Sequence, residues 1–361
     1  MHHPDICIAG AGIIGLSLAL ELHHRGVQVT ILDRGAPLAE ASTAAAGMLA
    51  AGDPHNPSQL RPLADLSLSL YPDFLDQLHI LSGIRVPLQT HTTLQALPPG
   101  APSTRNELTA QDLTRLLPAL NTGNHHFLLL EEQSLDPRQL ATALRAAIQS
   151  TTIDLRTNTS VLSTGSLDNA IVVYTPTSVL HVRQFIDCTG AWASATSQLS
   201  DIQVVPKKGQ MFSVSLPPSL PLQLVVRTPD IYIVPRTSGP NAGRAIIGAT
   251  IEDAGFDKII HPSDIDHLRS LATALLPPLV DAPQLEVWAG LRPATRDGLP
   301  LLGAISSHRN HLIATGHYRD GILLAPGTAH VMAQLLLGEA PSIDLAPFSP
   351  NRHSTRNRVT P

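Results

Sequence analysis

The sequence of 361 residues predicts an α/β protein in which a second, β-rich domain interrupts a parallel sheet. Three observations lead to this fold class. A strand, a glycine-rich turn, a helix and a second strand follow one another between residues 5 and 33. Another apolar strand, which ends in Thr-Gly at 189–190, comes only much later in the chain. Finally, two β-rich runs, 231–236 and 244–251, flank a turn region of Gly, Pro and Asn.

The first strand–helix–strand unit is defined by its apolar periodicity. Ile6 and Ile8 alternate as a short strand, and the same alternation recurs over residues 27–31. The helix between them has one buried face of residues spaced four apart, namely Ile14, Leu18 and Leu22. Gly26 is placed to end this helix. Further on, residues 62–81 predict a longer helix with an internal proline as a kink.

The turn between the first strand and the helix has the pattern G-x-G-x-x-G, formed by Gly10, Gly12 and Gly15. The first glycine permits the tight turn, the second lets the backbone approach a pyrophosphate, and the third lets helix and strand pack closely. The helix N-terminus offers N–H groups and partial positive charge to phosphates. Asp33, after the second strand, can accept hydrogen bonds from a ribose. In this order the features predict a dinucleotide site, and an ordinary βαβ unit with chance glycines is the plain alternative.

Composition narrows the class of protein. Hydrophobic residues make up 43% and charged residues 15%, and the net charge of −5 gives no reason to expect nucleic acid or a membrane surface as a partner. Cys7 and Cys188 are too few for a disulfide framework and favour a cytoplasmic location. Residues 6–20 are apolar, but Asp5 stands where a signal peptide carries positive charge, so no signal peptide is predicted.

Longer stretches resemble a known family. The matching stretches are IAGAGIIGLSLALEL, ASTAAAGMLA, SLDPRQLATAL, DCTGAWAS, PKKGQM, IYIVPR, IIGATIEDAGFD, WAGLRPATRDGLPLLG and ATGHYRDGILLAPGTA, which run from residue 5 to about 338. Together they resemble the D-amino-acid oxidase superfamily, and most closely the bacterial glycine oxidases of the thiamine-pathway type. The resemblance implies FAD as a non-covalent cofactor. Asp33 stands where many relatives carry Glu, and the shorter acid still reaches a ribose.

The resemblance also implies two interleaved domains. A Rossmann-like FAD-binding domain takes residues 1–80, 135–200 and 285–345. An α+β substrate domain with an antiparallel sheet takes residues 81–134 and 201–284. The proline-containing segments 98–102 and 217–221 are expected to be loops, and the polar tail, 346–361, is expected to be disordered.

The family motifs imply cofactor contacts position by position. The implied contacts are Gly10, Gly12, Ile14, Gly15, Asp33, Arg34, Ser42, Thr43, Ala45, Ala46, Gly47, Met48, Thr189, Gly190, Trp192, His317, Tyr318, Arg319, Asp320, Gly321 and Ile322. The apolar run after Gly321 opens a helix, whose N-terminus would face the flavin C2 carbonyl and stabilise negative charge on the reduced ring. Arg319 and Asp320 are therefore candidates to line the flavin.

Arg292 lies in a mostly apolar stretch, where a buried cation is unfavourable by several kcal/mol unless an anion meets it. The resemblance implies that its guanidinium binds the substrate carboxylate through two parallel hydrogen bonds. A structural salt bridge to Glu286 or Asp297 is the alternative. Tyr232 would donate a further hydrogen bond to the same carboxylate, and its alternative role is that of a core tyrosine with a satisfied hydroxyl.

Arg319 and Met48 complete the predicted substrate site. A protein carboxylate is the alternative partner of Arg319, and core packing is the alternative role of Met48. None of these residues is an obvious base; His317 is the nearest histidine in sequence, with an unperturbed pKa of about 6.5. A hydride mechanism needs no base. The histidines show no metal-ligand spacing, so no metal site is predicted.

The implied activity is FAD-dependent oxidation of glycine or other small amino acids and amines. Hydride passes from the substrate to the flavin, molecular oxygen is the acceptor, and the products are an oxo acid, ammonia and hydrogen peroxide. One alternative is a dehydrogenase that passes electrons to a quinone or a carrier protein. Another is a flavin-binding subunit of a larger amine-oxidising complex. Association into a homo-oligomer stays open.

Overall fold

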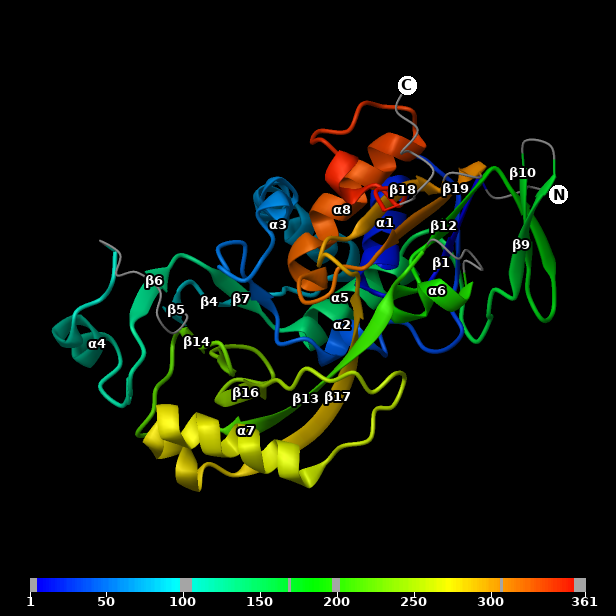
Figure 1. Cartoon of the computed structure of the whole chain (residues 1–361). Helices are drawn as coiled ribbons and strands as arrows, with labels where there is room; N and C mark the ends of the chain where they lie inside the picture. Colours follow the sequence, from blue (N-terminus) through cyan, green and yellow to red (C-terminus); the bar gives the residue numbers. More distant parts are fainter. Residues whose placement is uncertain (1–4, 98–105, 168–169, 197–201, 306–307, 354–361) are drawn as a thin grey trace.

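The computed structural model describes residues 5–97, 106–167, 170–196, 202–305 and 308–353. Two large sheets dominate these residues. A six-stranded sheet and its helices occupy the upper right of Figure 1, and a seven-stranded sheet occupies the lower part. The loop predicted at 98–102 lies outside the described residues.

The six-stranded sheet has the order β18–β19–β12–β1–β2–β8. Its strands are β1 Ile6–Ala9, β2 Val29–Leu32, β8 Asp154–Arg156, β12 Gln184–Asp187, β18 Leu301–Ile305 and β19 His308–Thr315. All neighbours are parallel except β18 and β19. Ile6 lies opposite both Val29 and Gln184, so the early and the late apolar strands predicted from the sequence share one sheet.

The two faces of this sheet are covered differently. Four helices cover one face: α1 Ile13–His24, α3 Arg61–Ser82, α5 Pro137–Gln149 and α8 Gly321–Leu336. Ile6 and Ile8 pack into the core on this side. Cys7 and Ala9 point to the other face, against a small antiparallel sheet. Its strands are β9 Ser163–Leu167, β10 Ala170–Tyr174 and β11 Val179–Val182.

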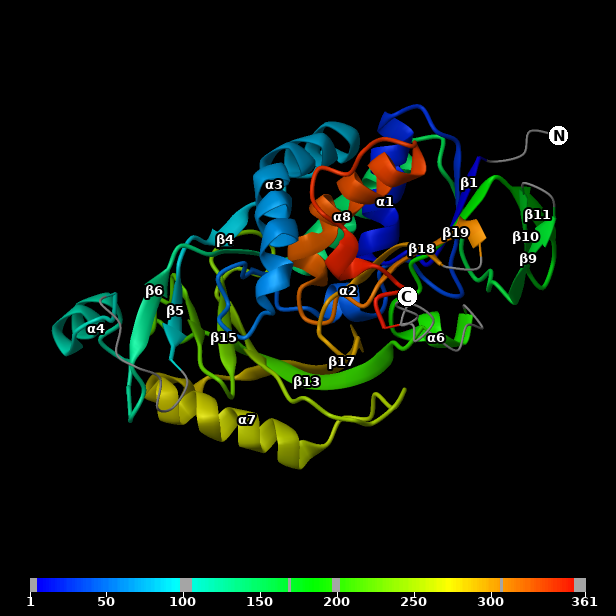
Figure 2. The same cartoon turned by 45° about the horizontal axis from the view of Figure 1, so that its top comes forward.

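Helix α8 is held tightly between its neighbours, as Figure 2 shows for α1, α3 and α8. Gly327 lets α8 approach α3, since a Cβ at this position would lie 2.9 Å from the Cβ of Ser67. The Ser67 hydroxyl donates to the carbonyl of Leu323 (2.6 Å) and accepts from the amide of Gly327 (3.0 Å). The helix predicted at 62–81 is confirmed as α3, with Pro72 inside it. These contacts fix the position of α8 against α3.

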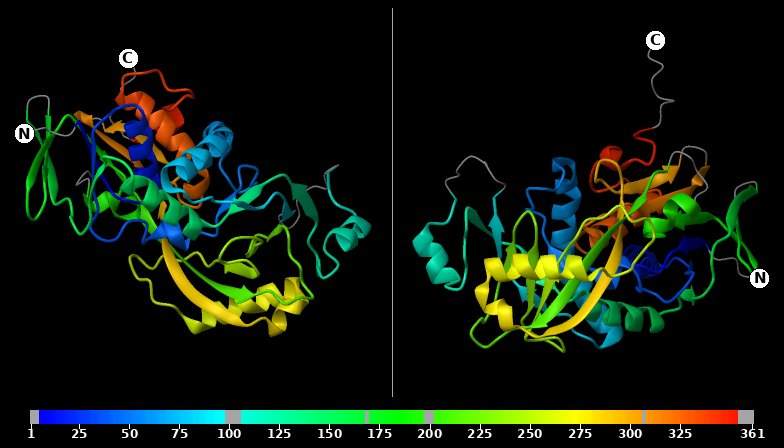
Figure 3. Two further views of the ribbon diagram at one scale, coloured as in Figure 1. Left: turned by 180° about the vertical axis from the view of Figure 1, so that it is seen from behind. Right: turned by 60° about the horizontal axis from the view of Figure 1, so that its bottom comes forward.

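The seven-stranded sheet has the order β17–β13–β16–β15–β14–β5–β6. Its strands are β5 Thr93–Ala96, β6 Phe127–Leu130, β13 Val205–Ser215, β14 Val225–Arg227, β15 Tyr232–Arg236, β16 Arg244–Gly248 and β17 Gln284–Ala294. Neighbours are antiparallel apart from β14 and β5. Helix α7, Pro262–Leu275, packs on β13 and β16 and shares a second apolar core with them (Figure 3).

The remaining elements are short. They are α2 Ala41–Ala44, α4 Ala110–Leu116, α6 Ala193–Thr196, the strands β3 Met48–Leu49, β4 Leu88–Thr90 and β7 Gln133–Leu135, and the 3₁₀ turns Ser58–Leu60, Gly190–Trp192, Pro277–Asp281 and Ala346–Phe348. Strands β3 and β4 pair with β7 in a three-stranded sheet. In the described ranges, the helices are too short or too polar to cross a bilayer.

Two boundaries differ from those expected. Strand β17 starts at Gln284 and pairs along its length with β13, so residues 285–294 lie in the seven-stranded sheet and not with the parallel sheet. Residues 346–353 have defined contacts: Phe348 is buried, and Arg352 binds Asp297 through two nitrogens at 2.7 Å each. Disorder from 346 onwards is therefore wrong for residues 346–353, because the Phe348 side chain is buried and the Arg352 side chain has a specific partner.

Candidate functional site

A cavity of about 470 Å³ lies between the two large sheets. It runs from the ends of β1, β2 and β12 to β15 and β17. The predicted site residues that line it are Gly10, Gly12, Ile14, Asp33, Arg34, Ser42, Ala45, Ala46, Gly47, Met48, Thr189, Gly190, Trp192, Tyr232, Arg292, His317, Tyr318, Arg319, Asp320, Gly321 and Ile322. Gly15 and Thr43 do not line it. Residues from distant parts of the sequence thus meet at one cavity.

The glycine turn places the N-terminus of α1 at the cavity. Gly10 has φ +100°, and a Cβ there would lie 2.5 Å from the carbonyl oxygen of Cys188, so glycine is required. A Cβ on Gly15 would overlap the carbonyl of Gly10, which explains why Gly15 serves helix packing and not the cavity wall. The amide of Ile13 donates to the Ser42 hydroxyl (2.9 Å) and ties the next segment to the helix start.

The acidic residue after β2 is fixed by the backbone around it. One oxygen of Asp33 accepts from the amide of Ala11 (2.6 Å) and the other accepts from the amide of Gly35 (2.8 Å). Next to it, the guanidinium of Arg34 lies 3.6 Å above the ring of Trp192 and pairs with Glu40 at 2.8 Å. This end of the cavity therefore carries a carboxylate and a cation stacked on an aromatic ring.

The small-residue segment 41–48 forms one wall and is held by the seven-stranded sheet. Arg236 donates to the carbonyl of Ala46 (2.9 Å), and the Trp288 indole donates to the carbonyl of Ala44 (3.1 Å). Thr43 turns away from the cavity and donates to the carbonyl of Leu38 (2.8 Å). The small side chains of this segment leave room beside it. Met48 lies on the cavity wall and packs against the apolar cluster at this end.

These features fit a dinucleotide cofactor such as FAD. The N-terminus of α1 suits a pyrophosphate, because the residue that precedes the helix, Gly12, has no side chain to fill the space in front of it. Asp33 suits a ribose, and the N-terminus of α8 lies at the far end of the same cavity. The N-termini of α1 and α8 and the Asp33 carboxylate thus lie along one cavity, as binding of an extended cofactor requires.

Arg292, on β17, lies over a glycine of the neighbouring strand β13. A Cβ on Gly209 would overlap the guanidinium, so the absence of a side chain makes room for it. One nitrogen of Arg292 donates to the carbonyl of Thr250 (3.1 Å). The two carboxylates considered as structural partners are engaged elsewhere: Glu286 with Arg138 and Asp297 with Arg352, each at 2.7 Å. In the described part of the chain, Arg292 faces the cavity without an ion-pair partner.

Tyr232, on β15, lies beside Arg292. Burial raises the pKa of Tyr232 above its ordinary value, and Arg292 opposes this shift, so the hydroxyl is protonated and able to donate at neutral pH. Its contact in the structure is the thioether of Met211 at 3.8 Å, a weak acceptor. Side chains alternate along β15: Tyr232 and Val234 belong to the cluster beside the cavity, whereas Ile233 faces the other core.

The segment before α8 closes the cavity. His317 is buried, and desolvation lowers its pKa to about 3, so the imidazole is neutral near pH 7. Its Nε2 lies 3.0 Å from the Thr328 hydroxyl. Tyr318 has φ +46° and donates its amide to the carbonyl of Pro293 (2.8 Å), which links this segment to β17. Asp320 is half-buried on the cavity wall, and desolvation raises the pKa of its carboxyl to about 7.

The sequence did not reveal one group of residues at this wall. Asp53 lines the cavity and pairs with Arg319 at 3.3 Å, the alternative that had been considered for Arg319. Behind Asp53 lie Arg227 and Glu132, both buried. These three residues come from separate segments with no motif, so only the fold brings them together. Among the described residues, no group of three His, Cys, Asp or Glu side chains is placed to hold a metal.

The chain resembles known proteins over nearly its whole length. The profile of a family described as FAD dependent oxidoreductase matches residues 5–335. A bifunctional protein ThiO/ThiG of Trichormus variabilis is 36% identical over 99% of this chain. The match covers only 56% of that relative, so the chain spans about half its length.

Glycine oxidases match from end to end. The enzyme of Geobacillus kaustophilus is 32% identical over 98% of each chain. The crystal structure of glycine oxidase from Geobacillus kaustophilus superposes with a TM-score of 0.89 and covers 98% of this chain and all of that one. Fold, cavity and sequence agree: the chain belongs to the family of FAD-dependent oxidoreductases of the D-amino-acid oxidase type and takes FAD as its cofactor.

Proposed function

We propose that the protein is an FAD-dependent oxidase of glycine or other small amino acids and amines. The overall reaction for glycine consumes water and molecular oxygen and yields glyoxylate, ammonia and hydrogen peroxide. The observation that carries this proposal is Arg292, a cation that faces the cavity with a carbonyl as its partner and with no carboxylate partner among the described residues. The likeness to glycine oxidases over the full chain supports it.

Each residue at the substrate end has a task that its chemistry permits. Arg292 would bind the substrate carboxylate through two nitrogens and so fix its orientation. Tyr232, protonated at neutral pH, would donate to the same carboxylate. Bound FAD supplies the acceptor for the hydride that leaves the α-carbon. Because His317 is neutral and a weak base, the substrate amine must itself be neutral when the C–H bond breaks.

The relatives named ThiO/ThiG support a place for this reaction in thiamine biosynthesis, which we include in the proposal. We also propose that FAD is held without a covalent bond. The chain has no cysteine after Cys188, and both cysteines are buried and free. Denatured protein should therefore release its flavin into the supernatant. Flavin that remained with the precipitate would contradict non-covalent binding.

A peroxide-release screen with purified single-chain protein in air tests the activity. Glycine, sarcosine and small D-amino acids should each yield peroxide and oxo acid in equal amounts. Turnover with an artificial quinone but not with oxygen would identify a dehydrogenase instead. Lack of turnover with either acceptor, in protein that retains FAD, would identify a subunit of a larger complex.

Variants of Arg292 test whether this residue binds the carboxylate of the substrate. Arg292→Ala should lower kcat/KM for glycine by about tenfold or more, since a hydrogen bond to a charged group contributes about 1.5–3 kcal/mol. Arg292→Lys should also lower it although the charge is kept, because lysine lacks the planar fork. Normal kcat/KM in both variants would make Arg292 a structural residue.

A further inference from the structure

The wall of the cavity beside Arg319 contains a cluster of buried charges, which we call the Asp53 cluster: Asp53, Arg227, Glu132 and Arg319. The side chains of Asp53, Arg227 and Glu132 are 6%, 3% and 5% exposed, whereas that of Arg319 is 36% exposed. Asp53 and Arg319 line the cavity, so the cluster reaches from the interior to the space where a substrate would lie.

Asp53 joins the two cations of the cluster. Its Oδ2 lies 3.3 Å from Arg319 and 3.8 Å from Arg227, and its Oδ1 accepts from the amide of His55 at 2.9 Å. Burial would raise the pKa of Asp53, but Arg227, the His55 amide and Arg319 outweigh it and hold the pKa below its ordinary value. Asp53 is therefore an ionised carboxylate that compensates the charge of Arg319.

The deeper members of the cluster compensate each other. Arg227 pairs with Glu132 at 3.0 Å and donates its Nε to the side chain of Gln95. Glu132 in turn accepts from the amide of Gly52 at 3.0 Å. Two guanidinium groups thus face two carboxyl groups. Arg227 has its own partner in Glu132, so Arg319 is the guanidinium that depends on Asp53. The other oxygen of Asp53 lies 3.0 Å from the imidazole of His55.

Arg292 and Arg319 consequently differ in what they offer a ligand. Both line the same cavity near Tyr232, and both act on its hydroxyl electrostatically. Within the described residues, Arg292 has a carbonyl but no carboxylate as its partner, whereas Arg319 already holds one. Among the described residues at the substrate end of the cavity, Arg292 is therefore the cation whose partner is a carbonyl and not a carboxylate. That charge balance suits a ligand with one carboxylate.

We infer that Asp53 determines substrate specificity: by neutralising Arg319 it restricts the site to amino acids with a single carboxylate. This inference rests on the proposed oxidase function. A second carboxylate on the substrate would meet the negative charge of Asp53 and find Arg319 already engaged. Removing the charge at position 53 would free Arg319 for that second carboxylate, as a charge-assisted hydrogen-bond donor.

Two pairs of substrates isolate the effect of the second carboxylate. D-Aspartate differs from D-alanine, and iminodiacetate from sarcosine, by one carboxylate each. Wild-type protein should strongly prefer the monocarboxylic member of each pair. In Asp53→Asn, the ratio of kcat/KM for dicarboxylic to monocarboxylic substrate should rise by about tenfold or more for at least one pair, the scale of a charged hydrogen bond.

Two control variants assign the effect to the Asp53–Arg319 pair. Asp53→Glu keeps the charge and should keep the wild-type preference. The double variant Asp53→Asn/Arg319→Gln removes the freed cation and should lose the gain. An unchanged ratio in Asp53→Asn, or a gain that persists in the double variant, would overturn the inference. If Asp53→Asn does not retain FAD, Asp53→Ser provides the same test with a smaller side chain.

A binding measurement separates this inference from the proposed function. Malonate and acetate, titrated against the flavin absorbance of the holoenzyme, report affinity for two carboxylates or one without turnover. The ratio of their dissociation constants should shift towards malonate by about tenfold in Asp53→Asn. If wild-type protein oxidised no amino acid, the oxidase proposal would fail while this ratio still tested Asp53. If it oxidised glycine but the ratio did not move, the role of Asp53 alone would fail.

Discussion

Gly209 shows how a single residue controls the predicted carboxylate site. It faces Gly290 across the β13–β17 pair, and the guanidinium of Arg292 occupies the space where its side chain would be. We expect Gly209→Ala to displace the guanidinium and raise the KM for glycine by about tenfold or more, on the scale of a lost charged hydrogen bond. FAD content should remain normal. The matched control is Gly165→Ala in β9, where a Cβ meets only the Tyr174 ring at an ordinary 3.7 Å. Equal KM values in the two variants would remove Gly209 from this role.

His317 is a second residue whose burial has a measurable consequence. Its pKa falls from about 6.5 to about 3 because the buried imidazole is desolvated. The folded state stays neutral while the unfolded chain gains a proton below pH 6.5, so folding is disfavoured as the pH falls from 6.5 towards 3. At pH 5 this destabilisation is roughly 2 kcal/mol.

His317→Gln should therefore lose less thermal stability than wild type between pH 7 and pH 5, measured as Tm of the holoenzyme. Flavin reduction by glycine should stay within about tenfold of wild type, since loss of a general base would slow it about 10²–10⁴-fold. A larger kinetic loss, with FAD and substrate still bound, would make His317 the base. An unchanged acid sensitivity of Tm would show that it is not buried in a neutral state.

At the scale of elements, the sequence predicted the helices and strands that depend on residues close together in the chain. Helices α1 and α3 and the strands β1, β2 and β15 follow from apolar periodicity and from glycine or proline at their ends. The pairing of β13 with β17 does not, because it joins segments about seventy residues apart through a register that only tertiary contacts select. The same reason explains the tail: its polar sequence predicts disorder, but Phe348 and Arg352 find their partners in distant segments.

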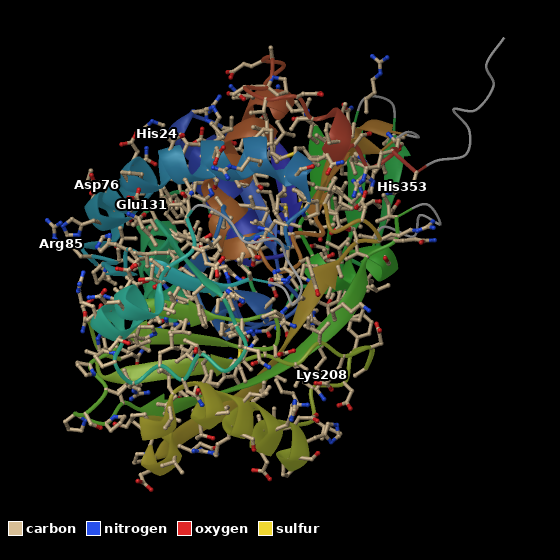
Figure 4. All side chains as sticks on the ribbon, turned by 60° about the vertical axis from the view of Figure 1, so that its left-hand side comes forward. His24, Asp76, Arg85, Glu131, Lys208 and His353 are labelled. Atoms are coloured by element: carbon tan, nitrogen blue, oxygen red, sulfur yellow. The ribbon has the colours of Figure 1, made fainter. Side chains whose placement is uncertain are left out.

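The segment after α8, in which Figure 4 labels His353, is held by an ion pair whose effect can be measured. Arg352 binds both oxygens of Asp297 and donates to the carbonyls of Pro300 and Leu299. Burial of Asp297 is outweighed by Arg352, so the pKa of that carboxyl is well below its ordinary value. This stabilisation is present above pH 4 and decreases as the pH falls further.

Arg352→Ala should lower the free energy of unfolding by about 1.5–3 kcal/mol, the scale of charged hydrogen bonds, and leave the KM for glycine unchanged. Arg145→Ala, an exposed position on α5, is the control for loss of one cation. Chemical denaturation at pH 7 measures the free energy of unfolding of both variants. If the two variants have the same stability, the ion pair does not hold the tail. A changed KM in Arg352→Ala would show that the tail acts on the site.

At the scale of the whole molecule, the site is a product of two sheets that fold around one cavity. The glycine turn and Asp33 belong to the parallel sheet, whereas Tyr232 and Arg292 belong to the other. Motifs predicted these residues because each motif lies in one short segment. Asp53, Arg227 and Glu132 lie in three segments and have meaning only as a cluster, so sequence alone could not identify them. Lys208 on β13 is also a fully buried charged residue that sequence alone could not identify (Figure 4). Its amino group pairs with Glu252.

Because the cavity lies between the two sheets, FAD should stabilise the whole fold. A ligand that binds only the native state raises stability by about 2.7 kcal/mol at one hundred times its Kd. We expect the Tm of the apoprotein to rise with added FAD and the midpoint of this rise to report the affinity. Asp33→Asn should move the midpoint to FAD concentrations higher by about tenfold or more, since the ribose would lose a charged acceptor.

Asp33 also accepts two backbone hydrogen bonds, so its loss destabilises the turn in the absence of FAD. The Tm of the apoproteins measures that effect separately from the FAD-dependent rise. Asp33→Glu, which keeps the charge on a longer side chain, should retain most of the affinity for FAD. If Asp33→Asn bound FAD with the wild-type midpoint, the acid would serve only the turn around Ala11 and Gly35, and the ribose would be recognised by other residues of the cavity.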